Sequence, residues 1–163
     1  VNAFSDGVAT IKSTLLSDRH HAEKLVFNQG GTIHFHCSYQ ILRILDVPYF
    51  HVTILNSNNI VIYAKDSFQF NLKHKQEALP GETVGFSGEI EANLAPGTYI
   101  ILLALHSAPK EALGISGIQL LDLKETSRKV IINAAIEFTV LAGADGTSFY
   151  GLVDLPSKAN IHE

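Results

Sequence analysis

The chain of 163 residues contains no methionine, no tryptophan and a single cysteine. Because there is no methionine, position 1 is not a natural translation start, and we expect the sequence to be a piece of a longer protein. A single cysteine excludes an internal disulfide, and the alternating apolar residues around Cys37 predict a small buried thiol. Without tryptophan, the strongest aromatic stacking platform is missing.

Charged residues are also scarce, at 17% of the chain, and the formal net charge is −4. No basic face is available to neutralise phosphates, so nucleic acid is a poor candidate partner. The longest apolar stretches, such as residues 99–105, are far shorter than the ~20 residues of a membrane-spanning helix. No charged-then-apolar leader opens the sequence, and we expect a soluble protein.

Hydrophobic residues are plentiful, at 46% of a 17.8 kDa chain. This length and composition predict one domain over residues 1–163, with a core large enough to fold alone.

Alternation of apolar and polar residues is the main structural signal. It predicts a strand over 32–41, where Ile33, Phe35, Cys37, Tyr39 and Ile41 form the buried side. Further strands are predicted at 8–16, 48–56, 60–64, 84–90, 98–106 and 130–140, with a short closing strand at 149–155. Turn signals separate them, and 119–123 is a candidate short helix. Seven or eight short strands with almost no helical period predict an all-β antiparallel β-sandwich.

Sequence motifs for common enzyme chemistry are missing. The sequence contains neither Gly-x-x-x-x-Gly-Lys-Ser/Thr nor Gly-x-Gly-x-x-Gly, the two usual phosphate-binding motifs. It also has no Gly-x-Ser-x-Gly nucleophile elbow, and Cys37 is predicted to point inward. We therefore expect neither nucleophilic catalysis nor ATP binding by these residues, and we predict no cofactor.

The pair His34-x-His36 raises the hypothesis of a metalloenzyme. Two histidines two apart on a strand project the same way and can share a metal ion, as in cupins and α-carbonic anhydrases. A cupin-like site requires a glutamate shortly after the second histidine, where this chain has Tyr39 and Gln40. A third ligand would have to come from His51, His106 or Glu137. We favour the interpretation that both histidines are exposed polar residues of the strand. A cupin-like metalloenzyme using His34 and His36 is kept as the alternative.

Polar positions on the predicted strands form a second pattern. They are His34, His36 and Gln40 on one strand, His51 and Thr53 on the next, and Glu137 near the end. Such groups can hydrogen-bond sugar hydroxyls from a rigid frame, although any solvated sheet face carries similar residues. Strands of opposite sheets cannot contribute to one site. If residues 32–42 lie apart from 48–56 and 130–140, the second group is the better candidate.

Apolar residues occupy both faces of the 98–106 strand, because Ile100, Leu102 and Ala104 fall on its outer side. We therefore expect another segment to pack on the outer face of this strand, and two segments are candidates. One is a second chain, with residues 148–155 swapped into a partner to form a homodimer. The other is the segment 107–127 of the same chain.

Several stretches resemble the C-terminal domain of Wzt, the ATP-binding subunit of ABC transporters that export O-antigen polysaccharide. They include residues 31–39, 46–54 and 60–63, the Leu-x-Pro-Gly-x-Tyr pattern that begins at Leu94, and the stretches 135–140 and 151–155. The resemblance covers about residues 8–155.

This resemblance implies an immunoglobulin-like β-sandwich that dimerises, often by exchanging its last strand. It also implies a non-catalytic module that binds the capped, non-reducing end of an O-antigen polysaccharide. The module would work in the cytoplasm at the inner membrane, joined through an upstream ATPase to the transporter's membrane subunit. No binding residue can be carried over by motif, so the candidates remain His34, His36, Gln40, His51, Thr53 and Glu137. An anionic cap would favour a nearby histidine, Lys65 or Arg43.

Overall fold

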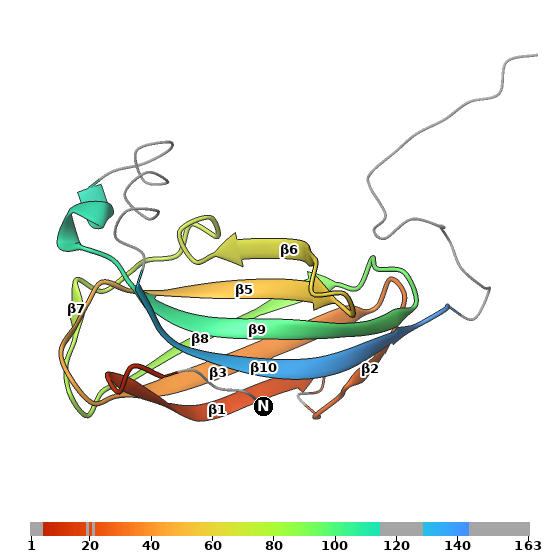
Figure 1. Ribbon diagram of the computed structural model, residues 1–163, viewed down its shortest axis with the longest axis horizontal. Coiled ribbons are helices and arrows are strands. Elements are labelled where there is room, and N and C mark those ends of the chain that lie inside the picture. Colours follow the sequence, from red (N-terminus) through yellow and green to blue (C-terminus); the bar gives the residue numbers. More distant parts are fainter. Residues whose placement is uncertain (1–4, 19, 21, 115–128, 144–163) are drawn as a thin grey trace, which may run out of the picture.

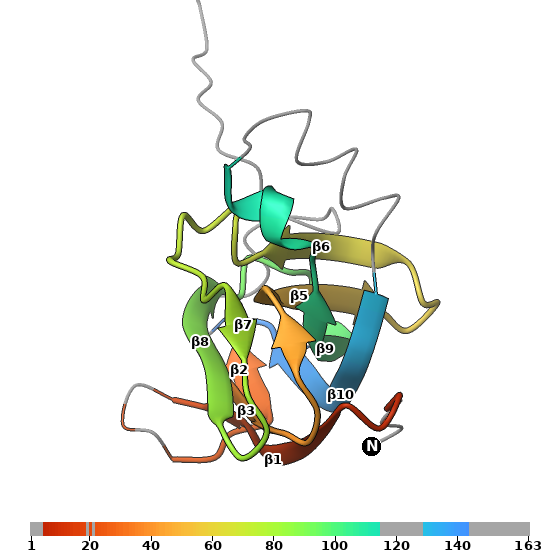
Figure 2. The same cartoon turned by 90° about the vertical axis from the view of Figure 1, so that its left-hand side faces the viewer.

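A computed structural model describes residues 5–18, 20, 22–114 and 129–143 of the chain. In this part, extended strands form two stacked layers (Figures 1 and 2). The elements are β1 (Ala9–Ser17), β2 (Val26–Asn28), β3 (Thr32–Ile41), β4 (Leu45–Asp46), β5 (Pro48–Asn56), β6 (Val61–Asp66), β7 (Glu77–Ala78), β8 (Thr83–Glu91), β9 (Gly97–Ser107), the 3-10 helix η1 (Lys110–Gly114) and β10 (Lys129–Leu141).

One layer is a three-stranded sheet of order β1-β3-β8, and the other is a five-stranded sheet of order β2-β10-β9-β5-β6. The small pair β4-β7 lies at one end of the sandwich (Figure 1). Among the described pairs, β2 runs parallel to β10 and the others are antiparallel. The predicted all-β sandwich is confirmed, and the long predicted strands are present. The short strands β2, β4 and β7 were not predicted.

The alternation of apolar and polar residues in β3 buries the predicted side of the strand. Ile33, Phe35, Cys37, Tyr39 and Ile41 are all 2% exposed or less, because successive side chains of a strand point to opposite faces. The strand β9 is a central strand, paired with β10 on one side and β5 on the other. Its inward residues Ile101, Leu103 and Leu105 are fully buried, whereas Ile100 and Leu102 on its outer face are half-buried.

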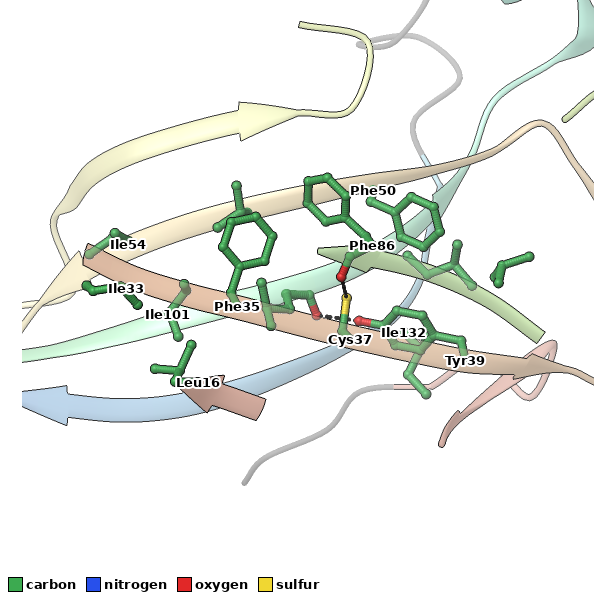
Figure 3. Close-up of a cluster of buried hydrophobic side chains, with 14 of the residues drawn as sticks. Leu16, Ile33, Phe35, Cys37, Tyr39, Phe50, Ile54, Phe86, Ile101 and Ile132 are labelled. Atoms are coloured by element: carbon green, nitrogen blue, oxygen red, sulfur yellow. Dashed lines mark hydrogen bonds between the residues drawn. The ribbon is translucent and has the colours of Figure 1, made fainter. Parts of the chain in front are cut away.

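The core between the sheets is built around aromatic rings (Figure 3). Phe50 of β5 stacks on Phe86 of β8, with ring centroids 5.4 Å apart, and Phe86 also contacts Phe35 at 5.1 Å. On its other side Phe50 stacks on Tyr39 at 6.3 Å. These contacts join strands of both layers and fix how the two sheets face each other.

A second, smaller apolar cluster lies outside the sandwich, on the five-stranded sheet. Val47 and Tyr49 pack there against Ala108 and Ala112, and Phe68 joins from the segment after β6. Tyr49 is 2% exposed, so its ring is buried in this cluster. The residues that follow β9, up to η1, therefore cover one end of this outer face.

Three predictions fall on residues outside the described part of the chain: the short helix at 119–123, the closing strand at 149–155 and the swapped strand at 148–155. Within the described residues, no helix is long and apolar enough to cross a membrane.

Candidate functional site

The six predicted binding residues fall into two groups on opposite sides of the molecule. His34, His36 and Gln40 lie on the outward side of β3, in the three-stranded sheet. His51 and Thr53 on β5, and Glu137 on β10, lie on the outward side of the five-stranded sheet. Because stacked sheets lie about 10 Å apart and these side chains point away from the interface, the two groups cannot form one site.

On the three-stranded sheet, the histidines take part in local contacts. His34 Nδ1 lies 3.8 Å from a carboxylate oxygen of Glu89, its cross-strand neighbour on β8. His36 Nε2 lies 3.2 Å from the hydroxyl of Ser13, which in turn lies 2.6 Å from the hydroxyl of Ser38. These contacts orient polar side chains on the surface and leave them accessible to solvent.

Two shallow hollows on this face share His34 and Glu89. The first has a volume of about 440 Å³ and also includes His36 and Ser87. The second, of about 600 Å³, adds Asp18, His20 and Lys24. The second hollow is lined by polar residues alone, whereas the first also includes the half-buried Leu15 and the buried Phe35. Sequence reasoning missed Glu89 and Ser87, because the pairing of β8 with β3 that brings them here is long-range.

The metal hypothesis required a third ligand beside His34 and His36. The three residues considered for that role, His51, His106 and Glu137, lie on β5, β9 and β10 of the other sheet. They point away from β3, so the predicted third ligand is wrong. Among the residues that the structure describes, no group of three or more His, Cys, Asp or Glu side chains could hold a metal ion.

The outward face of the five-stranded sheet has an apolar centre. Cross-strand register places Leu102 of β9 between Thr53 and Ala135. One step along, Ile100 lies between Leu55 and Glu137. Ile100, Leu102, Leu55 and Ala135 are each half-buried, so their aliphatic surfaces reach solvent without protruding.

Polar groups flank this centre on both sides. On β5, His51 Nδ1 lies 3.3 Å from the hydroxyl of Thr53, and the His51 ring meets His106 edge-on at 5.6 Å. On β10, Glu137 is exposed. Since β5 and β10 are both neighbours of β9, the two polar flanks are separated by roughly 10 Å across the sheet. We define the apolar centre and its flanks, Leu55, Ile100, Leu102, Ala135, His51, Thr53 and Glu137, as the β9 face.

The β9 face continues into a hollow of about 720 Å³ around the edge of β10, with Ile100, Ala135 and Glu137 on one side. Its other side comes from β1 and the segment that leads into β2, including Thr14, Glu23 and Leu25. These three residues were not predicted as site residues, because nothing in the local sequence indicates that the β2 segment pairs with β10.

The β9 face carries no lysine or arginine among its described residues. Lys65 of β6 is paired with Val52, whose side chain points inward, and its ammonium lies 4.2 Å from the centre of the Phe70 ring. Arg43 donates a hydrogen bond to the backbone carbonyl of Asp6. Neither cation, considered for an anionic cap, is therefore on the β9 face.

The buried cysteine is not a nucleophile. Cys37 is fully buried between the sheets, and its Sγ contacts the carbonyl oxygen of Phe86 at 3.6 Å. Burial raises the pKa of the Cys37 thiol to about 11, so the reactive thiolate is disfavoured at neutral pH. The predicted small buried thiol is confirmed.

Comparison with known proteins places this geometry in a wider context. The sequence matches the family described as the Wzt C-terminal domain over residues 1–155. A crystal structure of the C-terminal domain of Wzt superposes with a TM-score of 0.77 at 14% identity, covering 99% of this chain and 88% of that one. A Niemann-Pick type C2 protein from the Japanese carpenter ant superposes with a TM-score of 0.53 at 8% identity, covering 86% and 100%. At these identities both structures show the shared fold alone. No curated protein matches the sequence.

Proposed function

Because the chain belongs to the Wzt C-terminal domain family, we propose that it is a non-catalytic module that binds an O-antigen polysaccharide during export by an ABC transporter. Family membership supports the carbohydrate-binding role in O-antigen transport.

The glycan lies on the β9 face in this proposal. The observation that carries it is the register that places Ile100 and Leu102 between Thr53 and Glu137. A pyranose ring presents C–H groups that pack on an aliphatic surface and hydroxyls that need directed hydrogen bonds at its rim. The β9 face offers both on a rigid sheet, with four half-buried apolar side chains side by side, whereas the hollows beside His34 offer a single half-buried leucine, Leu15, next to their polar groups.

The glycan that this face suits is uncharged. Glu137 would accept hydrogen bonds from hydroxyls, and Thr53 and His51 can donate or accept them. Among the described residues of the β9 face there is no lysine or arginine, so a carboxylate or phosphate would meet the exposed carboxylate of Glu137 and none of these residues would neutralise it. The affinity should consequently depend little on salt.

The finer parts of the proposal come from the family resemblance. The module recognises the capped, non-reducing end of the glycan and acts as a homodimer. It lies at the cytoplasmic face of the inner membrane, joined through an ATPase domain to the transporter's membrane subunit.

Calorimetric titration with the source cell's own O-antigen glycan tests this function. The glycan is used intact and after removal of its non-reducing terminus. Saturable binding of the intact glycan, weakened at least about tenfold by the removal, is the expected result. Equal binding of both forms would contradict end recognition, and absence of binding to either would contradict the carbohydrate-binding role itself.

A further inference from the structure

A separate crevice of about 260 Å³ opens on the side of the sandwich, away from the β9 face. It lies where β8, the edge strand of its sheet, meets the start of β5 and the segment that follows β6 (Figure 2). The lining residues are Pro48, Phe50, Ser67, Leu72, Lys73, His74, Lys75, Thr83, Val84, Gly85 and Phe86. None of them belongs to the residues assigned above to the glycan.

The inner wall of the crevice is apolar. The rings of Phe50 and Phe86 are nearly parallel, at 14°, and are 9% and 4% exposed. Val84, at 7% exposure, lies two residues before Phe86 on the same side of β8. Because the two rings stack on each other, the parts of them that remain exposed form, together with Val84, a small apolar surface for a ligand.

One polar pair is held within the crevice. The Ser67 hydroxyl, 1% exposed, accepts a hydrogen bond of 3.0 Å from the Phe50 backbone N–H. The same oxygen lies 2.7 Å from Nε2 of His74, whose ring stacks on Phe68 at 3.9 Å. These contacts hold the His74 ring in one orientation beside the apolar wall.

The charged groups that line the crevice are cationic. Lys73 and Lys75 are both exposed, and no aspartate or glutamate is among the lining residues. Lys75 forms an ion pair of 3.2 Å with Glu82, which partly neutralises it. Lys73 makes no ion pair with any residue that the structure describes. A cationic rim on a chain of net charge −4 selects for an anion at this place.

The segment that carries the two lysines is hydrogen-bonded to itself. A carboxylate oxygen of Asp66 accepts backbone N–H bonds from Phe68 and Gln69, and the Leu72 N–H donates to the Ser67 carbonyl. The crevice is thus formed before a ligand arrives, so little ordering cost falls on binding.

We propose that this crevice binds a small carboxylate with a compact apolar body, the body against Val84 and the exposed parts of Phe50 and Phe86, and the carboxylate beside Lys73. The volume lies just below the range of about 300–1,000 Å³ typical of drug-sized ligands, so the ligand is the size of a single substituted ring. Binding here is independent of the glycan and of the proposed function.

Benzoate is the probe, and backbone amide NMR of the chain is the measurement. We expect saturable shifts centred on Val84, Gly85 and His74, with a Kd of about 1–10 mM, as suits so small a ligand. Benzyl alcohol, which keeps the ring and lacks the charge, should bind about fivefold more weakly. Absence of saturable shifts at these residues, or equal binding of the two probes, would overturn the proposal.

Two variants with matched controls test the assigned contacts. Lys73→Glu should weaken benzoate about fivefold, whereas Lys24→Glu, the same charge change on another face, should not. Leu72→Ala should also weaken binding, and Leu79→Ala serves as its control because the two leucines are 47% and 46% exposed. The amide spectrum reports whether each variant is folded. Equal affinities of a folded variant and its control would contradict the corresponding contact.

Discussion

The hydroxyl of Tyr39 donates a hydrogen bond of 2.8 Å to the backbone carbonyl of Leu103. Tyr39 lies on β3 (Figure 3) and Leu103 on β9, so this bond crosses the dry interior from the centre of one sheet to the centre of the other. A buried polar bond of this kind favours one alignment of two layers whose apolar surfaces could otherwise slide.

Tyr39→Phe should lower the free energy of unfolding by about 1–2 kcal/mol, because it removes the donor and keeps the ring. Urea denaturation measures the change. Tyr99→Phe is the matched control: the Tyr99 hydroxyl bonds the carbonyl of Ala95, four residues away, and does not join the sheets. A loss for Tyr99→Phe as large as that for Tyr39→Phe would contradict a special role for the bond between the layers.

The Cys37 thiol predicts a specific alkaline effect. Burial raises its pKa from the ordinary 9.0 to about 11, so the unfolded chain loses this proton first as the pH rises. The neutral thiol's contribution to stability is complete below pH 9 and is lost as the pH approaches 11. Between pH 8 and pH 11, the stability advantage of the wild type over Cys37→Ala should shrink by about 2 kcal/mol. A constant difference across this range would show that the thiol is not desolvated.

Gly88 on β8 faces Phe35 on β3 across the strand pair. A Cβ atom at position 88 would lie 2.7 Å from Cζ of the buried Phe35 ring, closer than contact distance. Gly88→Ala should therefore reduce the free energy of unfolding by about 1–3 kcal/mol through overpacking. Thermal denaturation checks this, with Gly114→Ala as the control because no atom lies within 4 Å of a Cβ there. Unchanged stability of Gly88→Ala would mean that the Phe35 ring has room to shift.

Much of the fold follows from local sequence pattern. The alternation in β3 predicted the buried side of that strand, and the predicted strands 48–56 and 60–64, separated by a turn signal, pair as β5 and β6. The parallel pairing of β2 was not predictable, because three residues carry too little periodicity. The burial of Tyr49 depends on η1, which is distant in sequence.

The candidate site could be predicted in part. The sequence identified polar positions such as His36 and Thr53 as outward-facing, and the structure agrees. It did not show which of them share a face, because sheet membership depends on long-range pairing. Residues 32–42 lie in a different sheet from residues 48–56 and 130–140. The candidate binding residues on 48–56 and 130–140 are therefore the preferred ones. The place of His51, Thr53 and Glu137 in glycan binding stays a prediction.

The most direct test of the central claim compares the two faces in one glycan titration. One double variant, Thr53→Ala with Glu137→Gln, alters the β9 face, and another, His36→Ala with Gln40→Ala, alters the three-stranded sheet. We predict that the first weakens binding of the intact O-antigen glycan at least about tenfold and that the second leaves it unchanged. The opposite pattern, or equal binding by both variants and the wild type, would contradict the account.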